Sequence, residues 1–464
     1  MNRLAVINVV GLCDRHIGPS MPFTQAMKNL GQRAFIRPAF PAVTCTAQSN
    51  YLTGKNASIH GIVANGWYNR DLAEVQFWKQ PNQLVQAPKI WDTLRVSKPN
   101  FTCAKIFWWF NMYSSVDWSI SPRPMYPADG RKIPDIYTYP ASVRTKIAED
   151  LGEFPFHGFW GPAAGRSTSK GTPDCASRWI AESAIWIEKK HSPTLSLVYL
   201  PHLDYNLQRV GPNDPSVSSD LRLIDNIIRD LVTTYKNRGV EPILISEYGI
   251  TECNKAVHLN RIFREQGWLT VREELGLELL DAGASRVFAV ADHQIAHIYL
   301  NDFKIKNEVQ ALLQSTEGVD TVMDIDSKTE NGINHARAGD LIAVSEENAW
   351  FTYYYWMEDD LAPDFARTVD IHRKPGYDPL ELFIDPKIKF PKSRIAARLL
   401  QKKFGLRMLM DVVPLDPTLV NGSHGCTPKD RADWPVLITG NNTPLNSNEI
   451  VNTDIHDVII NSME

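Results

Sequence analysis

The chain has 464 residues, a formal net charge of −4 and 43% hydrophobic residues. This length is large for one compact unit and predicts an α/β core with an added subdomain. The near-balanced charge excludes the electrostatic footprint of a protein that binds a nucleic-acid polymer. No apolar stretch is long enough to span a bilayer, so no membrane span is expected.

Six cysteines are scattered along the chain without a Cys-x-x-Cys pair. This spacing argues against a zinc ribbon and against a disulfide framework. The apolar run at residues 4–10 passes directly into Gly11 without the cleavage pattern of a signal peptide, and it is interpreted as a buried strand. These features predict a cytoplasmic protein, whereas the sequence does not indicate an oligomeric state.

Strand and helix patterns alternate along the first half of the chain. The predicted strands are residues 4–10, 34–37, 102–109, 194–200 and 242–246, and the predicted helices are 24–30, 89–94, 176–190 and 218–238. This alternation predicts a doubly wound, mostly parallel sheet with helices on both faces, which binds ligands at the carboxyl edge of its strands. Residues 111–175, rich in Pro, Gly and Tyr, are expected to form an irregular excursion over a site or surface.

The pattern changes after residue 284. Short strands and a helix between residues 285 and 349 predict a small α+β plait inserted into the core. Residues 350–420 open with an aromatic-rich segment and form an aromatic and charged insertion. Residues 421–464 are expected to return to the core, which otherwise comprises residues 1–284.

Residues 41–54 form a candidate nucleophile segment. A β-branched run changes into a helix-compatible segment, and Gly54 stands where a helix would end. Such a corner holds a hydroxyl at a helix N-terminus, where free N–H groups favour an anion. Thr44 is therefore the candidate nucleophile, and Asn65 the candidate donor to the developing negative charge. The alternative is that Thr44 or Thr46 only caps a helix.

Three short motifs carry a family resemblance: Pro-x-x-Thr at residues 41–44, Thr-Gly at 53–54 and His-Gly-Ile-x-x-Asn at 60–65. Together they resemble the nucleophile segment of type I phosphodiesterases and nucleotide pyrophosphatases. That family belongs to the alkaline phosphatase superfamily and includes phosphonoacetate hydrolases. The resemblance implies an alkaline phosphatase-like fold, a threonine nucleophile between two divalent metal ions, and an asparagine that steadies the phosphoryl oxygens.

The family's metal ligands are matched only in part. The resemblance assigns Asp204 and His424 as metal ligands, and Glu247 stands where an aspartate is expected. The pattern is broken at three positions, by Val10, Gln208 and Tyr248. Because three or four protein ligands per catalytic zinc are usual, the sequence predicts one divalent ion, zinc or manganese, rather than two.

The insertion offers replacement ligands. Asp370 and His372 point the same way in an extended segment, so both could reach one ion. Arg373 could instead grip a phosphate, and a solvated charged loop is the alternative. Asp292 and His293, with His297, are a further reserve of ligands, although histidines packed against a sheet are the more common outcome. The candidate substrate-binding residues are Trp108, Asn111, Tyr113, Tyr248 and Arg373, with core packing as the alternative for the aromatic ones.

These features predict a metal-dependent hydrolase of a phosphodiester, nucleotide pyrophosphate or phosphonate-like small molecule, with a threonine nucleophile and an atypical metal site. The alternative is a non-catalytic relative that binds a phosphorylated or acidic metabolite, or a biosynthetic partner. The retained Thr44, Asn65, Asp204 and His424 favour the enzyme. The three broken ligand positions favour the binding protein.

Overall fold

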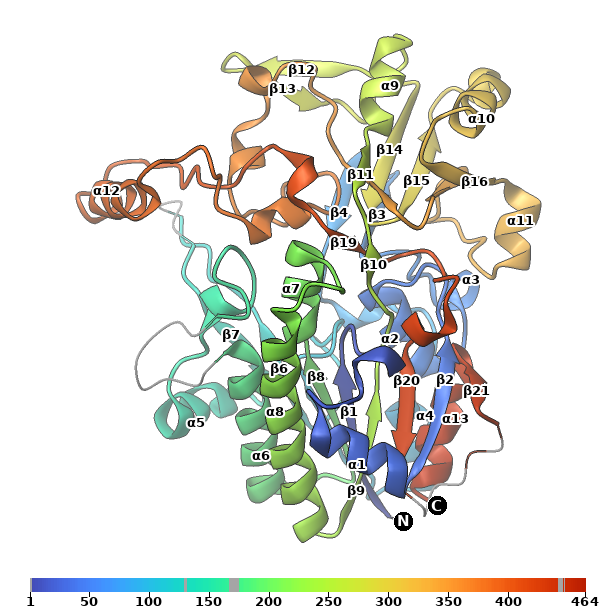
Figure 1. The fold of residues 1–464 in the computed structure, drawn as a ribbon, viewed down its shortest axis with the longest axis vertical. Helices are drawn as coiled ribbons and strands as arrows, with labels where there is room; N and C mark the ends of the chain where they lie inside the picture. Colours follow the sequence, from blue (N-terminus) through green and yellow to red (C-terminus); the bar gives the residue numbers. More distant parts are fainter. Residues whose placement is uncertain (1, 129–131, 167–174, 441–444, 446) are drawn as a thin grey trace.

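The computed structural model describes residues 2–128, 132–166, 175–440, 445 and 447–464. A nine-stranded sheet forms the lower lobe in Figure 1, and a four-stranded sheet lies in the upper lobe. Both termini lie at the end of the lower lobe that is remote from the upper lobe. Among the described residues, no helix has the length and apolar character that crossing a membrane requires.

The large sheet is mostly parallel, as predicted. Its spatial order is β21 (Glu449–Val451), β2 (Gln32–Arg37), β20 (Val436–Thr439), β9 (Val240–Ile245), β1 (Arg3–Val9), β8 (Leu195–Leu200), β5 (Cys103–Ile106), β6 (Trp118–Pro122) and β7 (Ile136–Tyr139). The central strands β9, β1, β8, β5 and β6 run parallel. Only β20 and β7 run against their neighbours. The carboxyl ends of the central strands therefore meet at one edge, beneath the upper lobe (Figure 1).

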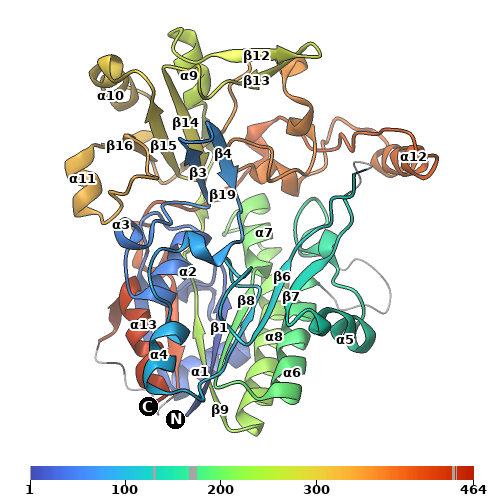
Figure 2. The ribbon, with the colours of Figure 1, turned by 180° about the vertical axis from the view of Figure 1, so that it is seen from behind.

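Helices cover both faces of this sheet (Figures 1 and 2). One face carries α1 (Pro22–Leu30), α6 (Ala176–His191) and α8 (Val217–Asn237), and the other carries α2 (Thr44–Thr53), α4 (Ile90–Ser97) and α13 (Ile455–Ser462). Side chains of β1 alternate between the two cores, with Ile7 and Val9 on one side and Leu4 and Val6 on the other. This alternation follows from the period of two in a strand, and it is why the sequence of β1 is continuously apolar.

The segment from residue 111 to residue 175 is less irregular than predicted. It contains β6, β7 and α5 (Ser142–Leu151), so it extends the large sheet by two strands. Surrounding Pro, Gly and Tyr residues hid these short strands in the sequence. The rest of the described part of this segment forms loops beside the upper lobe (Figure 2).

The upper lobe is built on the antiparallel sheet β14 (Val287–Asp292), β15 (Ile295–Leu300), β17 (Leu341–Ser345) and β16 (Val319–Met323). Its helices are α9 (Leu259–Glu265), α10 (Lys306–Gln314) and α11 (Ile325–Glu330). Short strand pairs complete it or join it to the large sheet: β3 (Gly66–Asn69) with β4 (Glu74–Phe77), β10 (Thr251–Glu252) with β19 (Gly422–Ser423), β11 (Lys255–Val257) with β18 (Ala349–Phe351), and β12 (Val271–Glu274) with β13 (Leu277–Leu280). The remaining helices are α3 (Ala57–His60), α7 (His202–Val210) and α12 (Pro391–Lys403).

One hydrophobic core holds the upper lobe together, and it extends beyond the predicted plait at residues 285–349. Tyr68, Phe263 and Trp356 belong to the same cluster as Phe288 of β14. The aromatic run that opens the 350–420 insertion is therefore buried against the small sheet. Only α12 projects away from the body of the lobe (Figures 1 and 2).

Candidate active site

Thr44 is the first residue of α2, at the carboxyl edge of the large sheet. Val43 before it is extended (φ −131°, ψ 155°), and α2 ends at Gly54 in the left-handed conformation (φ 64°). Every residue of α2 is buried. The predicted helix start is present, but residues 38–43 before it form a loop after β2 rather than a strand. The hydroxyl lies at the positive end of the helix dipole.

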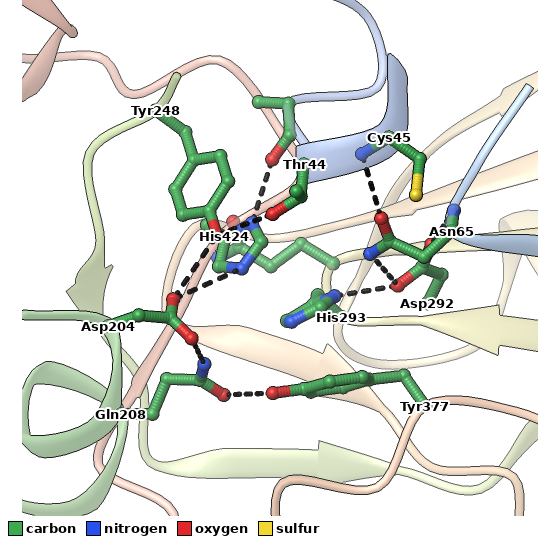
Figure 3. Close-up of polar contacts among 12 residues, drawn as sticks. Thr44, Cys45, Asn65, Asp204, Gln208, Tyr248, Asp292, His293, Tyr377 and His424 are labelled. Atoms are coloured by element: carbon green, nitrogen blue, oxygen red, sulfur yellow. Dashed lines mark hydrogen bonds and ion pairs between the residues drawn. The ribbon is translucent and has the colours of Figure 1, made fainter. Parts of the chain in front are cut away.

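A chain of hydrogen bonds runs from Thr44 toward α7 (Figure 3). The Oγ1 of Thr44 lies 3.1 Å from the Oη of Tyr248, which donates to Oδ1 of Asp204 at 3.2 Å. The Nε2 of Gln208 donates to Oδ2 of Asp204 at 2.8 Å, and Tyr377 donates to Oε1 of Gln208 at 2.9 Å. Because Asp204 and Gln208 stand four residues apart on α7, both side chains lie on the same face of the helix.

His424 closes one side of this chain. Its Nδ1 donates to the carbonyl oxygen of Ala42 at 2.7 Å, so its Nε2 carries a lone pair. That Nε2 is buried without a hydrogen-bond partner among the described residues, and it lies 3.9 Å from Oδ1 of Asp204. The imidazole stacks on the ring of Tyr248, with 3.6 Å between centroids and 8° between planes. Burial holds the pKa of His424 well below its usual value, so the ring is neutral.

Asn65 lies beside the site, but its amide is already engaged. Its Oδ1 accepts from the backbone N–H of Cys45 at 3.0 Å, and its Nδ2 donates to Oδ1 of Asp292 at 3.1 Å. Asp292 also accepts from the backbone N–H of Asn65 and contacts Nδ1 of His293. Asn65 therefore braces the first turn of α2, and its contact with a phosphoryl oxygen stays a prediction.

Glu247 lies on the inner side of the site, fully buried. Its Oε1 accepts from Nδ2 of Asn8 at 2.5 Å and from Nε2 of Gln48 at 2.7 Å. Burial raises the pKa of Glu247 to about 8, although the bonds from Gln48 and Asn8 oppose that rise. Burial also raises the pKa of Asp204, to about 7. Both carboxyls are thus held by neutral donors rather than by cations.

A cavity of about 650 Å³ opens beside Thr44. The lower lobe contributes Tyr248 and Asp204 to its wall, and the upper lobe contributes His293 and Tyr377. Most of the remaining wall is aromatic or apolar, including Trp78, Pro81, Trp109, Met112, Tyr113, Pro122, Pro124, Tyr126, Phe156, Phe159 and Trp160. The site is therefore a concave space between the two lobes with a hydroxyl on its wall, which is the usual setting of a small-molecule site.

Comparison with known proteins decides the family. The family model of type I phosphodiesterase/nucleotide pyrophosphatase matches residues 4–378. The chain belongs to this family. Membership confirms the resemblance of the sequence motifs, and the α/β fold expected from that resemblance is the one observed.

Solved structures of the alkaline phosphatase superfamily have the same fold. Murine ectonucleotide pyrophosphatase/phosphodiesterase 5, in an inactive form in complex with AMP, aligns with a TM-score of 0.58 at 14% identity, over 100% of this chain and 95% of that chain. Phosphonoacetate hydrolase from Sinorhizobium meliloti 1021, in complex with phosphonoformate, aligns with a TM-score of 0.59 at 13% identity, over 100% and 96%. An uncharacterized pyrophosphatase/phosphodiesterase of Schizosaccharomyces pombe is 22% identical over 256 residues, which are 52% of this chain and 44% of that protein.

Type I phosphodiesterases generally depend on divalent metal ions, and this chain's donor set does not fit them. Among the described residues, no group of three or more His, Cys, Asp or Glu side chains could hold an ion. Asp204 and His424 do approach each other, and the bare Nε2 of His424 has the character of a ligand, but two protein ligands are fewer than a catalytic zinc needs. Glu247 is bonded to the amides of Asn8 and Gln48, and Val10 supplies no ligand.

The predicted ligands in the insertion do not join this pair. Asp370 and His372 line the cavity, but the Nδ1 of His372 is bonded to the carbonyl oxygen of Phe77 at 3.2 Å. Among the described residues, Asp370 is not part of a group of three or more His, Cys, Asp or Glu side chains that could hold an ion. Arg373 also lines the cavity and pairs with Asp364 at 3.4 Å. Asp370 and His372 are polar parts of the cavity wall in this structure, and their binding of a common ion stays a prediction.

Two of the predicted substrate contacts are also corrected. Trp108 is fully buried in the core beneath the sheet, and the Nδ2 of Asn111 donates to the carbonyl oxygens of Lys105 and Ile120, which ties β5 to β6. Tyr113 does line the cavity, and so does Trp109, which the sequence did not distinguish from Trp108. A one-residue step along the chain turns a side chain to the opposite side, and only the fold shows which side is the cavity.

Proposed function

We propose that this chain hydrolyses a phosphodiester, nucleotide pyrophosphate or phosphonate-like compound with Thr44 as the nucleophile. The position of Thr44 supports the proposal above all. Its hydroxyl stands at the N-terminus of a buried helix and at the wall of a large cavity, and its oxygen is hydrogen-bonded to Tyr248. A nucleophile needs an open side for the phosphorus atom and a polar partner for its proton, and Thr44 has both.

The cavity wall indicates the kind of substrate. Lys79, Arg123, Lys132 and Arg373 line it, against the two carboxylates Asp204 and Asp370. This excess of positive charge favours an anion. The extensive aromatic surface favours a flat or apolar substituent on the phosphorus group. We therefore expect a small phosphorylated or phosphonate-like substrate that carries a bulky second group.

In the proposed reaction, Thr44 Oγ1 attacks phosphorus in line as the ester oxygen of the leaving group departs. The product of this step is a phosphothreonine, which water then cleaves to regenerate Thr44. The positive end of α2 faces the phosphoryl oxygens during both steps. The six free and buried cysteines suit a reducing compartment, and we place this activity in the cytoplasm.

Substitution of Thr44 tests the proposal. We expect wild-type protein to release p-nitrophenol from bis-p-nitrophenyl phosphate or from thymidine 5′-p-nitrophenyl phosphate. Thr44→Ala should abolish turnover, whereas Thr44→Ser should retain part of it because the hydroxyl is kept. Acid quench followed by mass spectrometry should find the phosphorylated peptide that contains residue 44 in the wild type only. Equal rates in wild type and Thr44→Ala would contradict the proposal.

A second candidate function is binding without turnover. The broken ligand positions support it: Val10, Gln208 and Tyr248 leave too few ligands for the family's ions. Such a protein would bind a phosphorylated or acidic metabolite, or a biosynthetic partner. Calorimetric binding of AMP or phosphonoacetate by the wild type, with no turnover of either p-nitrophenyl ester, would favour this function over hydrolysis.

A further inference from the structure

We propose that Tyr248 is a catalytic residue of this hydrolase, whose hydroxyl accepts the proton of Thr44 and passes its own proton to Asp204. The threonine is then activated by a hydrogen-bond relay within the chain instead of by an ion. This inference rests on the proposed function of Thr44 as the nucleophile. It follows from the disagreement between the family's metal chemistry and the side chains that surround Thr44.

The direction of the hydrogen bonds fits such a relay. Tyr248 has a single hydroxyl proton, and it donates that proton to Oδ1 of Asp204. Its oxygen lies 3.1 Å from Oγ1 of Thr44 and is then free to accept from that hydroxyl. Both bonds point from the nucleophile toward the carboxylate, which is the direction in which a proton must leave Thr44 during attack.

The relay is held rigidly from both sides. The ring of Tyr248 stacks on His424 at 3.6 Å between centroids, which fixes the position of its Oη. Asp204 is held by the Nε2 of Gln208, and Gln208 is held in turn by the hydroxyl of Tyr377. A neutral amide orients Asp204 without neutralising it, so the carboxylate remains able to take up a proton.

Two of the changed family positions bond the same carboxylate. Tyr248 and Gln208 stand where the family has histidines, and both are bonded to Asp204. Glu247, the altered acidic position, is bonded to Asn8 and Gln48. The replaced side chains satisfy both oxygens of Asp204, whereas among the described residues Oε2 of Glu247 and Nε2 of His424 are buried without a hydrogen-bond partner.

The first half of the proposed reaction transfers the phosphoryl group to Thr44. A bond forms between Thr44 Oγ1 and phosphorus while the bond from phosphorus to the leaving oxygen breaks. The hydroxyl proton of Thr44 moves to Oη of Tyr248, and the former proton of Tyr248 moves to Oδ1 of Asp204. In the second half, water attacks phosphorus and loses one proton to solvent. Asp204 then returns its proton through Tyr248 to Oγ1 as that oxygen leaves. The alkoxide of the leaving group, released in the first half, takes its proton from solvent.

The test compares Tyr248→Phe with the wild type in buffer that contains EDTA and 1,10-phenanthroline, using thymidine 5′-p-nitrophenyl phosphate. We expect wild-type kcat to be unchanged by the chelators. In Tyr248→Phe we expect kcat to fall by about 100-fold or more, the usual contribution of acid–base catalysis, with KM changed by less than about threefold. Thermal melting should stay close to that of the wild type, because phenylalanine keeps the stack on His424.

Tyr353→Phe is the matched control, since Tyr353 is a fully buried tyrosine of the upper-lobe core that does not line the cavity. It should keep the wild-type kcat. A solvent deuterium isotope effect on kcat should be present in the wild type and absent in Tyr248→Phe, which a merely structural role would not produce.

The outcomes separate the relay from the proposed function. Full activity of Tyr248→Phe with an inactive Thr44→Ala would overturn the relay and leave the nucleophile in place. Loss of wild-type activity in the chelators, restored by zinc or manganese, would also overturn the relay alone. Full activity of both variants, or no turnover by the wild type, would overturn both.

Discussion

Two clusters of buried carboxyls in this molecule are held in opposite ways. In the insertion, the ammonium group of Lys374 lies 2.7 Å from Asp378 and 2.8 Å from Glu381, and all three side chains are buried. At the candidate active site, neutral hydroxyl and amide groups bond Asp204 and Glu247. In the first cluster, both carboxyls are paired with Lys374, and these bonds hold the loop in place. Asp204 borders the cavity, and its hydrogen bonds among the described residues come from the neutral Tyr248 and Gln208.

The difference shows that a charged motif is a poor guide to chemistry. The segment around Asp370, His372, Arg373 and Lys374 has the residue types of a ligand or phosphate site, yet Lys374 is locked inside the protein. Tyr248 and Gln208 look like losses in the sequence, yet they contact the candidate nucleophile and its neighbouring carboxylate.

The largest effect on stability is expected from Lys374→Met. Removing the ammonium group leaves two buried carboxyls without their cation, which typically costs about 3–5 kcal/mol. Urea unfolding followed by tryptophan fluorescence measures the change in the free energy of unfolding. Lys389→Met, at an exposed position in the same insertion, should change it by less than about 0.5 kcal/mol. Similar unfolding curves for both variants would show that the Lys374 cluster does not stabilise the fold.

Asp204→Asn should affect activity far more than stability. The amide keeps the size of the carboxyl but cannot accept the proton from Tyr248, so kcat should fall by about 100-fold or more. The free energy of unfolding should change by about 1 kcal/mol or less, because Gln208 and Tyr248 are neutral partners. If Asp204→Asn lost as much stability as Lys374→Met and kept its kcat, Asp204 would be a structural residue and not a catalytic one.

Glu247 should make stability depend on pH. Its pKa is raised by burial to about 8 in the folded protein, above its value in the unfolded chain. Its stabilising contribution is therefore fully present below about pH 4.5 and is lost as the pH rises through about 8. Melting temperatures from pH 5 to pH 9 should fall more steeply in the wild type than in Glu247→Gln. Parallel curves would contradict this assignment.

The smallest effect is expected at the cavity wall. Tyr126 lines the cavity and is 59% exposed, so Tyr126→Ala should remove one aromatic contact with a bulky substrate. Such a contact contributes about 0.5–1.5 kcal/mol, which corresponds to a rise in KM of about two- to tenfold with kcat unchanged. Tyr139→Ala, an exposed tyrosine outside the cavity wall, should leave KM for the same p-nitrophenyl ester unchanged.

Much of the fold could be predicted from local pattern. The continuous apolar run of β1 and the long amphipathic helix α8 identified the doubly wound sheet, because buried parallel strands and helices that cover them have distinct periods. Strands β6 and β7 were missed, since their short lengths and neighbouring prolines give a weak local signal. The extent of the upper-lobe core was also missed, since Tyr68 and Trp356 join it from distant parts of the chain.

The sequence by itself determined the family, the helix start at Thr44 and the side chains available at the strand ends, because these depend on local pattern and on the order of motifs. Tertiary structure alone decided which of those side chains meet. Tyr248 reaches both Thr44 and Asp204, whereas Asn65 turns to Asp292 and Trp108 turns into the core. The physical reason is that hydrogen bonds and burial depend on distances between segments far apart in the chain, and local sequence does not fix those distances.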